Sequence, residues 1–240
     1  MIPSKVGFTL FEMLVSISVI AIVSTVTVFS FNVGVEKQAL ASASSQLNAM
    51  LRAARGQAIL NGTDARLIIN FDNSDQDKFL RFVGIVIQDK DDSTMWEAVS
   101  KGAFLPQGIY FVPQGNKVGF DSSWSSISPG DQLSEYRSTN GSTTSDAVMK
   151  LPYPEIGALK ADQAGDPEWI CYQFAPNGEL DYAVINGSGG GIPPFSNHIV
   201  IAAGKKDNAG KIVFSDNFSV KGIKFKRNGH TYAVDEVSVL

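Results

Sequence analysis

A long uncharged run near the start of the chain constrains its structure more than any other feature. No residue from Met13 to Val35 carries a charge, and most are Val, Ile, Leu, Ala, Ser or Phe. As an α-helix this run spans about 34 Å, and the hydrocarbon core of a bilayer is ~30 Å thick. In lipid such a run must be helical, because unpaired backbone groups are too costly there. We therefore expect a helix that crosses a membrane.

A glutamate, Glu12, lies at the front edge of this run. A carboxylate costs up to about 3 kcal/mol at the centre of a bilayer and less near its edge, and it usually has a partner. A plain single-span anchor explains the length of the run but leaves Glu12 unexplained. A cleaved secretory signal has a shorter apolar region followed by small residues. The best such cleavage site, Ala39-Leu40-Ala41, lies beyond Glu36 and Lys37, which argues against a secretory signal.

The residues around Glu12 offer a third explanation. Gly7-Phe8-Thr9-Leu10-Phe11-Glu12 follows a short leader that contains Lys5 and precedes the apolar run. This arrangement resembles the processing site of type IV pilins and of type II secretion pseudopilins. The resemblance implies that a prepilin peptidase cuts between Gly7 and Phe8 and methylates the new terminal amine. It also implies that Glu12 pairs with the amino terminus of a neighbouring subunit, so that a buried charge sets the register of a filament.

Residues 36–62 continue the helix with an amphipathic pattern. Apolar residues recur there at steps of three and four and predict one narrow, alanine-rich stripe that suits packing on a sheet: Leu40, Ala43, Leu47, Met50 or Leu51, Ala54 and Ala58. The polar residues Gln46, Asn48, Arg52 and Arg55 lie mostly off the stripe. Asn61-Gly62 predicts the end, so we expect one helix of about fifty residues. The alternative is two helices broken near Asn32–Gly34, although a glycine there also permits a simple bend.

The stretch "LRAARGQAILNGTDARLIINFD" gives a second resemblance, which covers residues 40 to 72 with the helix that precedes it. It is similar to the H-type (GspH/FimT-like) minor pseudopilins and minor pilins. "FAPNGELDY", Phe174–Tyr182, resembles a strand–turn–strand of the same family. Major pilins often carry a proline in the anchor helix and a cysteine pair near the C-terminus. This chain has no proline between Pro3 and Pro106 and one cysteine, which counts against a major pilin.

The rest of the chain, residues 63–240, predicts a β-rich domain. Apolar runs bounded by turn residues predict nine strands: Ala65–Phe71, Phe79–Gln88, Gly108–Val112, Trp169–Phe174, Leu180–Ile185, His198–Ala203, Lys211–Phe214, Gly222–Lys226 and His230–Val234. No helical period follows residue 62. We therefore expect an α+β fold, in which a long N-terminal helix packs on a mostly antiparallel sheet. Residues 121–147, with Trp124 and Tyr136, are rich in Ser, Thr, Gly and Asp and predict a long surface loop.

Composition argues against several classes of function. The net charge of −4 with no basic block argues against a nucleic-acid partner. Cys171 stands alone, and His198 and His230 have no acid or cysteine at motif spacing, so we expect no enzyme and no cofactor. The glycine run at 187–191 leads into two prolines, so it does not predict a phosphate-binding loop.

The turn after the first predicted strand carries candidate calcium ligands, Asp72, Asp75 and Asp77. An EF-hand loop starting at Asp72 requires a glycine at its sixth position and a glutamate at its twelfth, where this chain has Asp77 and Val83. The spacing therefore favours a solvated hairpin turn over a metal site.

The family resemblance completes the expectations from sequence. Residues 1–7 are a leader, 8–35 a transmembrane and filament-core helix, 36–62 its amphipathic continuation, and 63–240 a periplasmic domain. The chain is expected to be a single-pass protein of a bacterial inner membrane that joins a pilus or a type II pseudopilus. Its expected partners are prepilin peptidase, other pilin or pseudopilin subunits and the inner-membrane assembly platform. An anchored binding domain that never polymerises, such as an adhesin or glycan reader, is the alternative.

Overall fold

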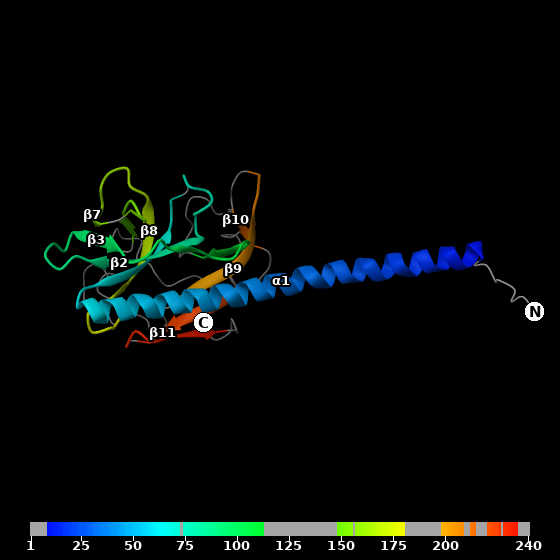
Figure 1. Ribbon diagram of the computed structural model, residues 1–240, viewed down its shortest axis with the longest axis horizontal. Helices are drawn as coiled ribbons and strands as arrows, with labels where there is room; N and C mark the ends of the chain where they lie inside the picture. The colour runs from blue at the N-terminus through cyan, green and yellow to red at the C-terminus, as the bar shows by residue number, and fades with distance from the viewer. Residues whose placement is uncertain are drawn as a thin grey trace, which may run out of the picture. The chain divides into compact units, whose positions relative to one another are not determined.

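The computed structural model describes residues 9–72, 74–112, 148–155, 157–180, 198–208, 212–214, 220–226 and 228–234, apart from the side chains of 23–34 and 148. The chain divides into two compact units, Met1–Gln38 and Ala39–Leu240. The second unit is an α+β structure in which a helix packs on antiparallel sheets (Figure 1). The predicted fold class is confirmed at this level.

One helix, α1, runs for 52 residues from Leu10 to Asn61. Its backbone is helical through 32–34, so the alternative of two helices broken there is wrong. The helix ends as predicted, because Gly62 takes a positive φ of 67° and its N–H bonds the carbonyl of Ala58 at 2.9 Å. Within the described residues, no helix is both long and apolar enough to cross a membrane. The expected spanning segment, 8–35, includes Phe8 and the side chains of 23–34, which lie outside the described part.

Within the described residues, the strands form two antiparallel sheets. The first has seven strands in the order β6-β8-β1-β2-β3-β7, with β4 also on β2: β1 (Ala65–Asn70), β2 (Phe82–Gln88), β3 (Met95–Ala98), β4 (Ala103–Phe104), β6 (Val148–Lys150), β7 (Ala158–Lys160) and β8 (Glu168–Phe174). The second has five in the order β10-β9-β11-β12, with β5 also on β9: β5 (Ile109–Phe111), β9 (His198–Lys206), β10 (Ile212–Phe214), β11 (Val220–Phe225) and β12 (Thr231–Val234).

The main core lies between α1 and the inner faces of both sheets. The predicted stripe is the buried face of the helix: Leu40, Ala43, Leu47, Leu51, Ala54 and Ala58 are at most 3% exposed. Figure 1 shows β9 and β11 lying along this half of α1. Each buried leucine of the stripe contributes about 1.5–3 kcal/mol, and the alanines let the helix approach the strands closely. The helix pattern in the sequence therefore located one side of the core correctly.

A second apolar cluster covers the outer face of the first sheet. It contains Ile68, Phe82, Val86, Trp96, Met149, Leu151, Tyr153, Trp169 and Cys171. Leu67 and Ile69 face the main core from β1, while Ile68 between them faces the second cluster. Burial on both faces explains why β1 and β2 are continuous apolar runs, where a one-sided sheet would give an alternating pattern.

Polar side chains flank the stripe and bond α1 to the strands around it. Gln46 Nε2 donates to the carbonyl of Phe104 at 3.0 Å, and Arg55 Nε donates to that of Gly178 at 2.9 Å. On the other side, the Thr231 hydroxyl donates to Asn48 Oδ1. These bonds reach β4, the turn after β8, and β12, so they fix the rotation of the helix on the domain.

Several strand predictions need correction. The strand predicted to begin at Phe79 begins at Phe82, because 75–81 form a turn in which Leu80 takes a positive φ of 57°. Four short strands were missed, β3, β4, β6 and β7, because runs of two to four residues carry no clear period. From the predicted strand Leu180–Ile185 the structure describes only Leu180, which bridges to Phe174. The predicted loop 121–147 lies outside the described residues.

Candidate functional site

Thr9 and Glu12 form a reciprocal cap at the start of α1. The N–H of Glu12 donates to Thr9 Oγ1 at 3.2 Å, and the N–H of Thr9 donates to Glu12 Oε2 at 3.1 Å. The Thr9 hydroxyl also donates to Oε2 at 3.1 Å. This is a capping box, in which two backbone N–H groups that the helix itself leaves unbonded find acceptors. A carboxylate in the first turn is also favoured by the helix dipole.

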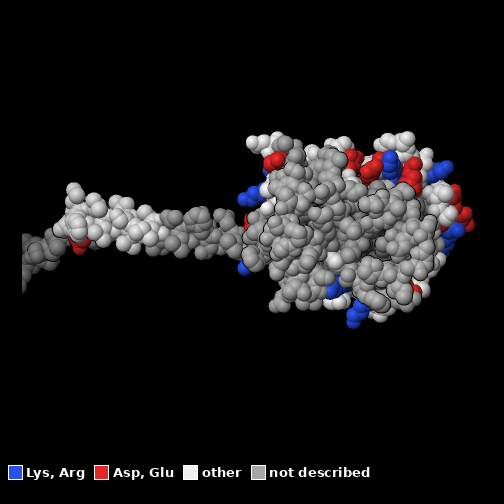
Figure 2. All heavy atoms as spheres, turned by 180° about the vertical axis from the view of Figure 1, so that it is seen from behind, with Lys and Arg blue, Asp and Glu red and all other residues white. Residues whose placement is uncertain are grey.

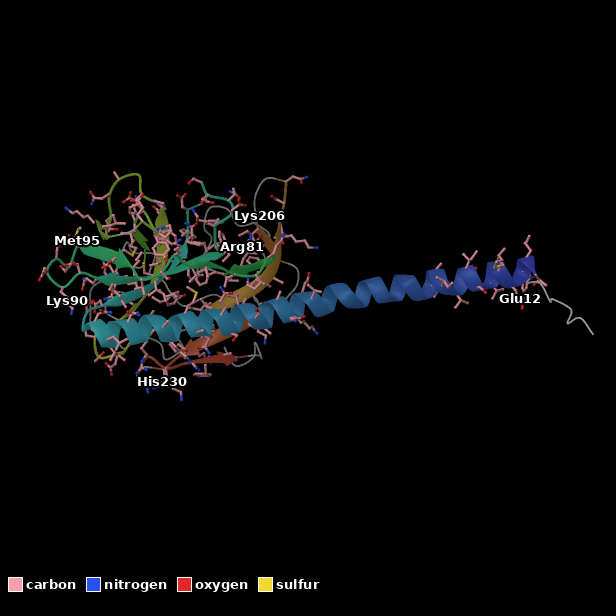
Figure 3. All side chains as sticks on the ribbon, viewed as in Figure 1. Glu12, Arg81, Lys90, Met95, Lys206 and His230 are labelled. Atoms are coloured by element: carbon pink, nitrogen blue, oxygen red, sulfur yellow. The ribbon has the colours of Figure 1, made fainter. Side chains whose placement is uncertain are left out.

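The cap leaves part of the Glu12 carboxylate available. All of its bonds to Thr9 go to Oε2. In the described part of the chain no basic side chain lies within 4.0 Å of Glu12. Glu12 is labelled in Figure 3 at the beginning of the helix. Its carboxylate therefore has a structural role in the free chain and retains an oxygen that accepts a further donor.

The first turns of α1 expose apolar side chains on every side. All residues from Leu10 to Ile22 are exposed, and the large apolar ones are Leu10, Phe11, Met13, Leu14, Val15, Ile17, Val19, Ile20 and Ile22. In Figure 2 the described part of this segment is white except for acidic atoms near its end. A helix that is apolar all round is stable only when something covers it, such as lipid or other protein.

The hydroxyls within this segment are satisfied by the helix itself. Ser16 Oγ donates to the carbonyl of Glu12, and Ser18 Oγ donates to the carbonyl of Leu14, both at 2.8 Å. A serine that bonds the carbonyl four residues earlier needs no water. Apart from Glu12, the described segment is thus compatible with an apolar environment.

The other residues singled out by sequence lie apart from one another or outside the described part of the chain. Gly7 and Phe8, the predicted processing residues, lie outside it, as do Trp124, Tyr136 and the glycines of 187–191. His198 is buried at the start of β9, and His230 is exposed in the turn between β11 and β12.

Cys171, on β8, is buried among the residues of the second cluster on the outer face of the first sheet. Burial raises the pKa of its thiol to about 11, and the nearby Arg66 offsets only part of this rise. At neutral pH the sulfur is therefore a protonated thiol, which is a poor nucleophile and a poor metal ligand.

Asp72 and Asp75, two of the three candidate calcium ligands, accept hydrogen bonds from nearby backbone N–H groups. Asp72 Oδ1 accepts the N–H of Ser74 at 2.9 Å, and Asp75 Oδ1 accepts those of Asp77 and Lys78 at 3.2 Å. Asp75 also pairs with Lys78 Nζ at 2.8 Å, and this bond lowers the pKa of its carboxyl. Among the described residues, no group of three or more His, Cys, Asp or Glu side chains could hold a metal ion.

The prediction from sequence did not identify Thr9 as a partner of Glu12 within the chain, although the spacing of the two residues indicates it. Thr-x-x-Glu immediately before an apolar run is the sequence signature of a capping box. Thr9 is therefore a residue of this site that the spacing alone could have identified.

The chain was compared with models of known protein families, with curated proteins and with solved structures, and none of the three comparisons finds a match.

Proposed function

We propose that the chain is a minor subunit of a type II secretion pseudopilus or a type IV pilus. Prepilin peptidase removes residues 1–7 and methylates the amine of Phe8. Residues 8–35 then hold the subunit in the bacterial inner membrane, with the β-rich domain in the periplasm, until the assembly platform adds it to a filament. The filament serves protein secretion or surface attachment, and the subunit itself is not an enzyme.

The exposed apolar surface of Leu10–Ile22 carries this proposal. Such a surface needs a cover, and a subunit that leaves a membrane for a filament is covered by lipid first and by neighbouring helices later. The charge-free sequence continues to Val35, a length that matches a bilayer core of ~30 Å. The Gly7-Phe8-Thr9-Leu10-Phe11-Glu12 motif at its front supports a processed subunit over a permanent anchor.

The geometry of Glu12 supports a second role during assembly. One oxygen caps the helix through Thr9, and the other is available for the terminal amine of a neighbour. Leaving a carboxylate buried and unpaired costs several kcal/mol, so a subunit inserted out of register is disfavoured. The same carboxylate thus begins the helix and specifies the position of the next subunit.

The alternative is a membrane-anchored binding domain that does not polymerise. The capping box supports this alternative, because the bonds to Thr9 explain the presence of Glu12 without a neighbouring subunit. The two functions differ in whether the charge of Glu12 matters once the cap is preserved.

Two substitutions separate these functions. Glu12→Gln keeps a side chain that completes a capping box but removes the charge, whereas Thr9→Ala weakens the cap and keeps the charge. Filaments sheared from cells that produce each variant are probed for the subunit, and the mature N-terminus is determined by mass spectrometry. The proposal expects a methylated Phe8 in the natural chain, loss of Glu12→Gln from filaments, and retention of Thr9→Ala. Equal incorporation of both variants, or an unprocessed natural chain, contradicts it.

A further inference from the structure

Arg81 follows a residue with an unusual backbone conformation. Leu80 is fully buried and has a φ of 57°, in the left-handed region that non-glycine residues seldom adopt. Its N–H donates to the carbonyl of Asn70, and its carbonyl accepts the N–H of Phe111, both at 2.9 Å. Such a conformation costs about 1–3 kcal/mol and occurs preferentially at functional sites. Here it sets the direction in which the chain leaves the turn at Arg81.

The guanidinium of Arg81 lies between aromatic rings where the two sheets meet. Its Cζ is 5.7 Å from the ring centroid of Tyr110 on β5 and 6.0 Å from that of Phe104 on β4. Nη2 donates to the carbonyl of Leu105 at 3.3 Å, while Nε is buried with no hydrogen-bond partner. Among the described residues no carboxylate lies within 4.0 Å of it. A partly desolvated cation with an unbonded N–H has an unmet preference for an anion.

A second cation, Lys206, lies close to Arg81. It ends β9 in the second sheet, and Figure 3 labels both residues at the same end of the domain. Burial lowers the pKa of Lys206, the charge of Asp77 raises it, and the charge of Arg81 lowers it again. The two cations therefore repel one another across the junction of the sheets, and an anion between them would relieve that repulsion.

The acidic groups near this pair favour an anion of low charge. The charges of Asp77 and Asp75 both act on Lys206, and Asp75 is also bonded to Lys78. Two carboxylates are therefore already close to the pair. They would repel a phosphate dianion more strongly than a single carboxylate. Phe104, at 47% exposed, adds apolar surface next to Arg81.

We propose that Arg81 and Lys206 bind one acidic side chain of a partner polypeptide, whose neighbouring apolar residue covers Phe104. A carboxylate would receive charge-assisted bonds from the guanidinium and the ammonium. Arginine and aromatic residues are the types most enriched at the centres of protein interfaces. The site is on the β-rich domain and does not depend on the proposed assembly role of Glu12.

The test follows the Nε–H resonance of Arg81 by NMR in the full chain, held in detergent micelles. The Arg81→Lys variant has no Nε–H group, so the resonance missing from its spectrum is that of Arg81. The probes are a blocked Ala-Glu-Leu peptide, the matched Ala-Gln-Leu peptide, inorganic phosphate, and sodium chloride at equal ionic strength. We expect a saturable shift with the Glu peptide alone. Lys206→Gln is expected to weaken binding about tenfold, the loss of one charge-assisted bond.

Lys205→Gln is the matched control, because Lys205 is exposed, precedes Lys206 on β9 and carries the same charge. It is expected to leave the affinity within about twofold of the natural chain, as for other exposed charges. Equal effects of the two lysine substitutions would show that Lys206 adds only general positive charge, and would overturn the paired site. Equal shifts with the Gln peptide or with sodium chloride would show that Arg81 is only structural. Saturation by phosphate at lower concentration than by the Glu peptide overturns the assignment to a carboxylate.

Discussion

The ring of Tyr153 lies directly over Gly84 on the outer face of the first sheet. A Cβ atom added to Gly84 would be 2.5 Å from Tyr153 Cζ, and the ring is held there by Trp169, whose centroid is 5.4 Å away. The Tyr153 hydroxyl donates to the carbonyl of Ser100. Gly84→Ala is therefore expected to lower the free energy of unfolding by about 1–3 kcal/mol, the cost of overpacking. Urea unfolding followed by tryptophan fluorescence measures the change.

Gly56→Ala is the control for this prediction, because a Cβ at Gly56 meets nothing within 4 Å. Gly56 lies inside α1, where alanine is favoured over glycine by about 1 kcal/mol. The two substitutions add the same methyl group and are expected to change stability in opposite directions. If Gly84→Ala were neutral or stabilising, the packing of Tyr153 on β2 would be wrong.

A second pair of glycines tests the junction between the end of α1 and the β-rich domain. Gly229 and Gly165 both have positive φ, at 75° and 94°, so alanine costs a similar backbone strain of about 1 kcal/mol at each. A Cβ at Gly229 would overlap the carbonyl oxygen of Gly178, which accepts the bond from Arg55, whereas one at Gly165 meets nothing. Gly229→Ala is therefore expected to destabilise the chain by a further 1–3 kcal/mol or so. Equal losses in thermal unfolding would contradict the contact.

Features of the fold that depend on local periodicity were predictable from sequence. The stripe from Leu40 to Ala58 repeats every three to four residues, and a period of that kind defines a buried helix face wherever the helix packs. The order of the strands was not predictable, because β1 pairs with β2 and with β8, and β8 is distant in the sequence. A glycine inside a strand often marks a close contact, but nothing in the sequence near Gly84 identifies Tyr153 as its partner.

The two proposed sites also differ in whether neighbouring residues in the sequence identify them. Glu12 was identified from adjacent residues, and Thr9 lies only one helical turn away. Arg81 ends the turn before β2 in the first sheet, whereas Lys206 ends β9 in the second. Arg81 also follows the positive φ of Leu80, which the sequence does not indicate. Residues that come together only when two sheets pack have no characteristic spacing in the sequence, so such a site cannot be recognised there.

The thiol of Cys171 provides a pH test of the second cluster. Its pKa is raised from 9.0 to about 11, so the folded chain is expected to react with a disulfide reagent at pH 8 about a hundredfold more slowly than the urea-unfolded chain.

The same shift in the pKa of Cys171 predicts how stability depends on pH. A group with a raised pKa contributes stability that is complete below its unfolded pKa. That stability is lost as the pH rises from 9.0 through about 11, so the urea midpoint is expected to fall in that range. A Cys171→Ser variant lacks the thiol, so the change of its urea midpoint with pH measures the contribution of all other groups. Rapid labelling of the folded chain at pH 8 would place the thiol at the surface.

The proposal that residues 1–7 are a leader can be tested at the residue before the expected cut. A peptidase that cuts after Gly7 needs close access to the backbone there, and a side chain at that position obstructs it. Gly7→Ala is therefore expected to leave residues 1–7 and the unmethylated chain intact, as measured by the intact mass of the purified protein. Gly56→Ala changes a glycine outside the motif in the same way and is expected to be processed like the natural chain. Both chains are also produced in a host without prepilin peptidase, where neither should be cut. Cleavage in that host would show that another enzyme matures the chain, and cleavage of Gly7→Ala at the natural rate would show that Gly7 is not needed for processing. Either result would remove the main support for a pilin-like subunit.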